Sequence, residues 1–187
     1  MDYQQLVEQV KSSPRYRKNI EYGSPRLGHP EGLVKHHIAE LEANLEKLKP
    51  RLRDEDEYWK LEFLIHVHDT FKAEALPDRP TVVDPRGHAS LARQFASELI
   101  DDHDLLNMIQ YHDENYALWR QFESMGQYDQ QRMLKLIDLI QDWDLFLTFM
   151  IIDGSSPGKD IEKLHWFIAE FRKYGTADVD ETWLGLG

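Results

Sequence analysis

Residues 58–75 read YWKLEFLIHVHDTFKAEA, and this stretch decides how the rest of the chain is interpreted. Leu61, Leu64 and Ile65 recur at the spacing of three and four residues that is typical of the buried face of a helix. His68 lies one turn beyond Leu64, so it projects from the same apolar face, and Asp69 follows it directly. A buried imidazole needs a polar partner. The stretch therefore poses a choice between a locally hydrogen-bonded histidine and a metal ligand.

The same spacing recurs along most of the chain and predicts an all-α protein. Residues 129–152 are apolar almost all round, which predicts one long central helix. No stretch alternates between apolar and polar residues as a half-buried strand would. The expected helices cover residues 34–49, 55–75, 88–99, 104–112, 115–123, 129–152 and 158–174.

Length and composition indicate a single soluble domain. The 187 residues are enough to bury one core, so residues 1–187 are expected to form one domain. The chain has no cysteine, which excludes disulfides and thiolate metal sites and is consistent with the cytoplasm. The longest apolar run, at 145–152, is far shorter than the roughly 20 residues of a membrane span. The first residues do not resemble a secretory signal, so no membrane association is expected.

The net charge of −12 limits the kinds of partner that this protein can bind. Such an acidic chain repels polyanions, so nonspecific binding of nucleic acid is not expected. A small phosphorylated substrate is still compatible with this charge, because a local group of cations can bind it. Two loops, 22–32 and 76–87, contain proline, glycine and arginine, and loops on a rigid scaffold often carry binding groups. Arg26, Arg79 and Arg86 are therefore candidate substrate-binding residues, although a solvated surface arginine is the more common explanation for each.

Four histidines project from apolar faces of four different predicted helices. They are His37, His68, His88 and His112. Any one of them alone would be explained by a hydrogen bond to a nearby backbone carbonyl. Four inward-facing imidazoles are more simply explained by one shared partner, and a metal centre is such a partner. His36 is the main alternative to His37 as the first ligand.

Carboxylates for the same centre are available at two positions. Asp69 directly follows His68, and Asp138 lies in a polar stripe with Lys135 and Asp142 that could also be the solvated side of its helix. Imidazole and carboxylate ligands together suit Mn, Fe, Co, Ni or Zn. His66 lies on the other side of its helix, where it is expected to be exposed or to support a ligand.

Several motifs occur in an order that resembles the HD-domain superfamily of metal-dependent phosphohydrolases, over about residues 29–145. HDTFK at 68–72 is similar to the HD-x-G-K motif of that family, with Phe71 in place of the usual glycine. HPEGLVKHH at 29–37 resembles the segment that opens the HD portion of some bacterial tRNA nucleotidyltransferases, which favours His37 over His36. The remaining similar segments are GHASLARQF at 87–95, MIQYHDE at 108–114 and KLIDLIQDWD at 135–144.

The resemblance implies a helical bundle of the HD-domain type around one or two divalent ions, with an N-terminal helix and a C-terminal helix plus tail appended. His37, His68, Asp69 and Asp138 would hold the first ion, Asp69 would bridge, and His88 with His112 would hold the second. Two such ions can clamp a phosphate and activate a water molecule. Asp69 and Lys72 would then be the catalytic residues, with Lys72 neutralising phosphate charge.

The expected function is hydrolysis of a phosphoester in a nucleotide or in a cyclic or linear phosphodiester. One alternative is an HD-fold di-iron oxygenase acting on a small, phosphonate-like or polyol-like substrate. Lys72 favours hydrolysis, because an oxygenase has less need of a phosphate partner there. A second alternative is a sensor that binds a nucleotide or a partner protein and holds a structural metal. The run at 145–152 and the tail with Trp183 are consistent with a homodimer, with a monomer as the alternative.

Overall fold

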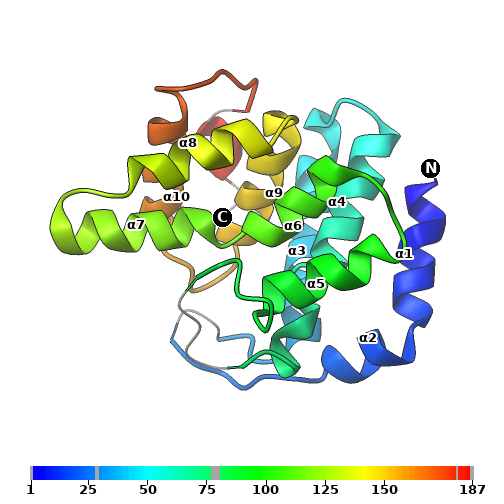
Figure 1. Cartoon of the computed structure of the whole chain (residues 1–187). Helices are drawn as coiled ribbons and strands as arrows, with labels where there is room; N and C mark the ends of the chain where they lie inside the picture. Colours follow the sequence, from blue (N-terminus) through cyan, green and yellow to red (C-terminus); the bar gives the residue numbers. More distant parts are fainter. Residues whose placement is uncertain (1, 28–29, 77–80, 180, 186–187) are drawn as a thin grey trace.

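The computed structural model describes residues 2–27, 30–76, 81–179 and 181–185, and within these ranges it is built from helices and contains no β-sheet (Figure 1). The expectation of an all-α protein is confirmed. The α-helices are α1 (Tyr3–Ser12), α2 (Pro14–Asn19), α3 (Val34–Leu48), α4 (Glu55–Val67), α5 (His88–Ser97), α6 (His103–Tyr111), α7 (Glu114–Met125), α8 (Gln130–Leu139), α9 (Trp143–Gly154) and α10 (Glu162–Phe171). Short 3-10 helices cover Lys49–Arg51, Thr70–Ala73 and Glu181–Leu184.

Helix α4 lies at the centre of the molecule. It packs against α1, α3, α6 and α9, and every residue from Leu61 to Phe71 is buried. A helix whose side chains are covered by other elements on every side lies inside the fold. His66 is part of this buried run, so of its two expected positions the exposed one is wrong.

The helix predicted for residues 55–75 ends early. Helix α4 stops at Val67, and a separate 3-10 helix begins at Thr70, whose hydroxyl donates to the carbonyl oxygen of His66. The turn between them contains His68 and Asp69, with Asp69 at φ −105° and ψ −7°. The sequence pair HD therefore lies where the central helix ends, and not along its length.

The single long helix predicted for residues 129–152 is wrong, because two helices, α8 and α9, occupy this segment. Ile140 adopts an extended conformation with ψ 126°, which ends α8. The Asp104 carboxylate accepts hydrogen bonds of 2.8 Å from the backbone N–H groups of both Gln141 and Asp142. The Asp142 side chain in turn caps α9 by accepting from the N–H of Leu145, a cap of the kind that contributes about 1 kcal/mol.

The apolar run at 145–152 is buried inside the chain as the main part of α9, which packs on α3, α4 and α10. It is therefore not available as a dimer face. Trp183 in the tail packs against the core, with the Arg51 guanidinium 5.5 Å from the centre of its ring. The homodimer stays a prediction that these two features no longer support. In the described ranges, no helix has the length and apolar character needed to cross a membrane.

Candidate metal centre

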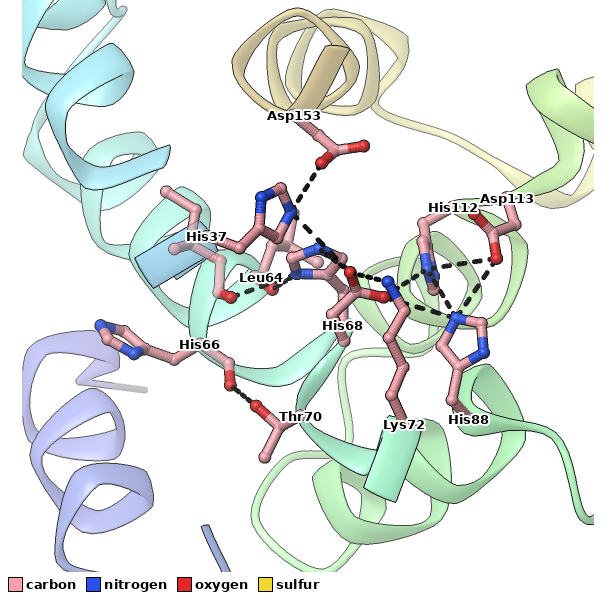
Figure 2. A network of polar contacts seen from close by, with 12 residues as sticks. His37, Leu64, His66, His68, Thr70, Lys72, His88, His112, Asp113 and Asp153 are labelled. Carbon is pink, nitrogen blue, oxygen red and sulfur yellow. Dashed lines mark hydrogen bonds and ion pairs between the residues drawn. The ribbon is translucent and has the colours of Figure 1, made fainter. Parts of the chain in front are cut away.

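Five of the six predicted metal ligands meet at one end of α4 (Figure 2). They come from four separate places in the fold: α3, the turn after α4, the first residue of α5 and the residue that ends α6. All five side chains are buried although each is polar or charged. The residues are His37, His68, Asp69, His88 and His112. His36, the alternative first ligand, is exposed.

The ligands form two clusters. The first cluster consists of His37, His68 and Asp153, and the second cluster of Asp69, His88 and His112. Within each cluster the candidate ligand atoms all lie within 4.8 Å of one another. In the first cluster His37 Nε2 lies 3.0 Å from Asp153 Oδ1, and in the second His88 Nε2 lies 3.1 Å from His112 Nε2. Each cluster therefore has the size of a site for one ion.

Asp69 joins the two clusters through its two carboxylate oxygens. Oδ2 lies 3.5 Å from His68 Nε2 and 3.8 Å from His37 Nε2. Oδ1 lies 3.4 Å from His88 Nε2 and 3.5 Å from His112 Nε2. The carboxylate thus faces both clusters at once, which is the position of a bridging ligand.

Hydrogen bonds to the backbone fix how two of the imidazoles are oriented. His68 Nδ1 lies 3.1 Å from the carbonyl oxygens of Leu64 and Ile65, and His112 Nδ1 lies 2.8 Å from that of Ile109. A carbonyl can only accept, so Nδ1 carries the proton in both rings. In the neutral ring the lone pair is then on Nε2, which points into the centre. Metal-binding histidines are usually oriented in this way.

The residues present fit a metal ion. His68 Nε2 and Asp69 Oδ1 are fully buried and have no hydrogen-bond partner among the described residues. A buried polar atom without a partner costs about 1–3 kcal/mol, and coordination to an ion would satisfy both atoms. Neutral imidazoles with carboxylates form a donor set for a divalent transition metal, and the identity of that metal is open.

Asp138, the sixth predicted ligand, does not lie with the other five. It is exposed on α8, which the break at residues 140–142 separates from α9. Asp153, near the end of α9, completes the first cluster in its place. Asp153 lies beyond residue 145, the predicted limit of the core segment. One feature of the sequence could have identified Asp153: it is a single carboxylate directly after the apolar run 145–152, whose eight residues are all buried.

Cations hold the two central carboxylates in their ionised form. Burial opposes the charge of Asp69, but Lys72, which donates a hydrogen bond to its Oδ2, is the largest opposing influence, and the pKa of Asp69 lies well below its usual range. Burial likewise opposes the charge of Asp153, and Lys159, 3.1 Å away, with His37 holds its pKa low. Ionised carboxylates are the form that binds metal.

Burial acts differently on the histidines. It lowers the pKa of His68 and of His88, which favours the neutral form that binds metal. It also opposes protonation of His112, but the nearby Asp113 and Asp69 outweigh it and raise the pKa of His112 to about 9. The metal-free second cluster therefore carries a proton on His112 at neutral pH.

We expect metal binding at the second cluster to release this proton. His112 is protonated below pH 9 and must lose its proton to offer Nε2 to an ion, so affinity should rise about tenfold per pH unit between pH 7 and 9 and fall as acid is added. Calorimetric titration at pH 7 in two buffers of different ionisation enthalpy should show about one proton released per ion. Equal heats in both buffers would contradict this expectation.

An open cleft of about 710 Å³ leads to the second cluster and to Asp69 and Asp153. Several cationic side chains line it: Arg26, Lys72, Arg120, Lys159 and Lys163. Acidic residues are also present, and Asp113, whose side chain is 47% exposed, lies 3.2 Å from His88. The cleft therefore presents several positive charges beside the candidate metal ligands.

Of the three arginines predicted to bind substrate, only Arg26 lines this cleft. Arg86 is directed to Asp84, 3.3 Å away, its side chain is 67% exposed, and it is not among the residues that line the cleft. Arg79 lies outside the described residues. Lys159 and Lys163, which the sequence patterns did not single out, come from the loop after α9 and from α10.

Comparison with protein-family models, with curated proteins and with solved structures finds no match to this chain.

Proposed function

We propose that this protein is a metal-dependent phosphohydrolase of the HD-domain type, acting on a nucleotide or on a cyclic or linear phosphodiester. The observation that carries the proposal is the position of Asp69, which faces two histidine clusters at the end of a cleft lined with cations. The order of His37, His68, Asp69, His88 and His112 in the sequence, which resembles that family, supports the same assignment. Asp153 takes the role first expected for Asp138.

The residues of the centre have distinct roles in this proposal. His37, His68 and Asp153 would hold one divalent ion, His88 and His112 a second, and Asp69 would bridge them. When bound, the two ions supply an activated water molecule and neutralise charge on the phosphate. The two Nδ1–H···O=C hydrogen bonds of His68 and His112 keep these rings aligned for that purpose.

The cations of the cleft have roles that do not depend on which metal is bound. Lys72, held beside Asp69, and Lys163 are placed to bind the phosphate oxygens, and charge-assisted hydrogen bonds of this kind are stronger than neutral ones. Lys159, whose side chain is only 10% exposed, fixes Asp153. Arg26 and Arg120 also line the cleft and add positive charge, which would bind a second phosphate or attract the substrate.

The test is a screen of nucleoside mono-, di- and triphosphates and of cyclic and linear phosphodiesters, with protein loaded separately with Mn, Co, Ni and Zn. The proposal expects release of phosphate or of a nucleoside monophosphate that chelator abolishes. Two irons per chain with oxygen consumption and no phosphate release would favour the di-iron oxygenase. Nucleotide binding that survives chelation, without turnover in any metal form, would favour the sensor.

Replacing Lys163 by Ala is expected to raise KM for a phosphorylated substrate about tenfold, equivalent to about 1.4 kcal/mol of lost binding. Lys163 lines the cleft without being a candidate metal ligand, so metal content should not change. Steady-state kinetics with elemental analysis checks both statements. Lys35→Ala is the matched control, because Lys35 pairs with Glu21 outside the cleft. Equal KM values for the two variants would remove Lys163 from the substrate site.

A further inference from the structure

A second group of metal-binding side chains lies on another side of α4. Glu42 of α3 and Glu62 and His66 of α4 bring one candidate ligand atom each to within 4.8 Å of one another. We call these three residues the α3–α4 cluster. Figure 2 shows the His66 ring turned away from His37, His68 and the other histidines of the proposed centre. The α3–α4 cluster is therefore separate from that centre.

Two buried atoms of the α3–α4 cluster point to a missing ligand. The His66 side chain is 3% exposed, and its Nε2 is buried with no hydrogen-bond partner among the described residues. Glu62 Oε2 is also buried and has no such partner. These two atoms lie 3.4 Å apart, and His66 Nε2 lies 3.2 Å from the Glu42 carboxylate. An ion there would satisfy the two atoms at once.

The spacing of the ligand atoms matches a first-row divalent ion. His66 Nε2 lies 3.2 Å from Glu42 Oε1 and 3.4 Å from Glu62 Oε2. Two ligands about 2.1 Å from a zinc ion at a tetrahedral angle are separated by about 3.4 Å. Burial opposes protonation of His66, but the two carboxylates outweigh it and raise the pKa of His66, so an ion bonded to Nε2 would take the place of a proton between them.

Neighbouring tyrosines hold the ligands in place. The Tyr16 hydroxyl is 2.6 Å from His66 Nδ1, and the Tyr58 hydroxyl donates to Glu62 Oε1 over 3.1 Å. Partners of this kind orient ligands and are typical of metal sites. The Glu42 side chain is 38% exposed, which gives an ion a route in from solvent, and Lys11 lies 3.6 Å from its carboxylate.

We propose that the α3–α4 cluster binds one divalent transition-metal ion, with Zn²⁺ as the reference case, through His66 Nε2 and the Glu42 and Glu62 carboxylates. Solvent would complete the coordination on the Glu42 side. The ion would tie α3, which carries His37, to α4, which leads into His68. The site stands independently of the proposed phosphohydrolase function, because it shares no ligand with the centre around Asp69.

The test compares Zn²⁺ binding by the full-length wild type, Glu42→Gln and His66→Gln, using equilibrium dialysis and elemental analysis. Each variant is expected to bind one Zn²⁺ fewer per chain than wild type, or to bind that ion at least tenfold more weakly. Saturating Zn²⁺ should also raise Tm less in the variants, because a ligand that binds only the folded state stabilises it. Glu8→Gln changes an exposed glutamate of α1 that is not one of the three ligands, and as the control it should bind as wild type does.

Glu42 is partly exposed, so Glu42→Gln is expected to fold, and circular dichroism checks this. If Glu42→Gln and His66→Gln both bind the same number of Zn²⁺ ions as wild type with the same affinity, the proposal is overturned. His66 would then be a protonated partner of the two carboxylates. Phosphoesterase activity or its absence has no bearing on this result, so the two proposals succeed or fail separately.

Discussion

Replacing Asp69 by Asn is expected to remove metal from the centre and to abolish turnover. Among the residues that the structure describes, Asp69 is the one whose carboxylate faces both clusters, and the neutral amide would lose the charge that two cations require. Loss of a partner that only supports a ligand costs about 10–100-fold in metal affinity or activity, and loss of the bridging ligand should exceed that range. Elemental analysis of protein purified without chelator should show a loss of up to two ions per chain, and kcat/KM should fall by at least about 1,000-fold.

Two controls accompany this variant. Circular dichroism shows whether Asp69→Asn has folded, which matters because Asp69 is buried and bonded to Lys72. Asp129→Asn changes the aspartate that caps α8, which belongs to neither cluster, and should retain metal and activity. A folded Asp69→Asn protein with wild-type metal content would disprove the bridging role.

A second large effect is expected from Asp153→Asn, and none from Asp138→Asn. Asp153 lies 3.0 Å from His37 Nε2 in the first cluster, whereas Asp138 is exposed on α8. Asp153→Asn should lose one ion per chain and lower kcat/KM by at least about 100-fold, the upper end of the range for residues that only support a ligand. Asp138→Asn should match wild type in both respects. Metal analysis and kinetics on the two variants in parallel decide between the carboxylates.

The opposite pattern, with metal lost from Asp138→Asn and retained in Asp153→Asn, would show that the sequence-based assignment was correct and that the arrangement of α8 and α9 is not the one described. The Asp153→Asn result also depends on Lys159, which would lose its carboxylate partner. The double variant Asp153→Asn, Lys159→Met removes this uncompensated charge and should lose the same ion.

The helices and most of the centre could be predicted from the sequence for physical reasons. Apolar spacing of three and four residues reports directly on which helix face is buried, and His37, His68, His88 and His112 all lie on such faces. The order of the motifs then grouped these residues before any contact was known. Local patterns were sufficient here because each of these histidines lies in a helix of its own or directly at its end.

The closing carboxylate could not be predicted in the same way. Residues 129–152 are apolar enough to suggest one continuous helix, and the break at 140–142 depends on Asp104, which accepts hydrogen bonds from Gln141 and Asp142. Asp104 belongs to α6, more than 30 positions earlier in the chain. The spacing of apolar residues is a local property of the sequence, so it cannot predict a contact between segments this far apart in the chain. Asp138 was assigned because KLIDLIQDWD resembles the closing segment of the family, whereas Asp153 lies beyond the segment that carries the resemblance.

The central claim is that two ions flank Asp69, and a crystal structure of protein loaded with Mn²⁺, with anomalous data at the manganese edge, tests it most directly. The account predicts one anomalous peak among His37, His68 and Asp153 and a second between His88 and His112, each also bonded to an Asp69 oxygen. Data without a peak at bonding distance from the Asp69 carboxylate would contradict it.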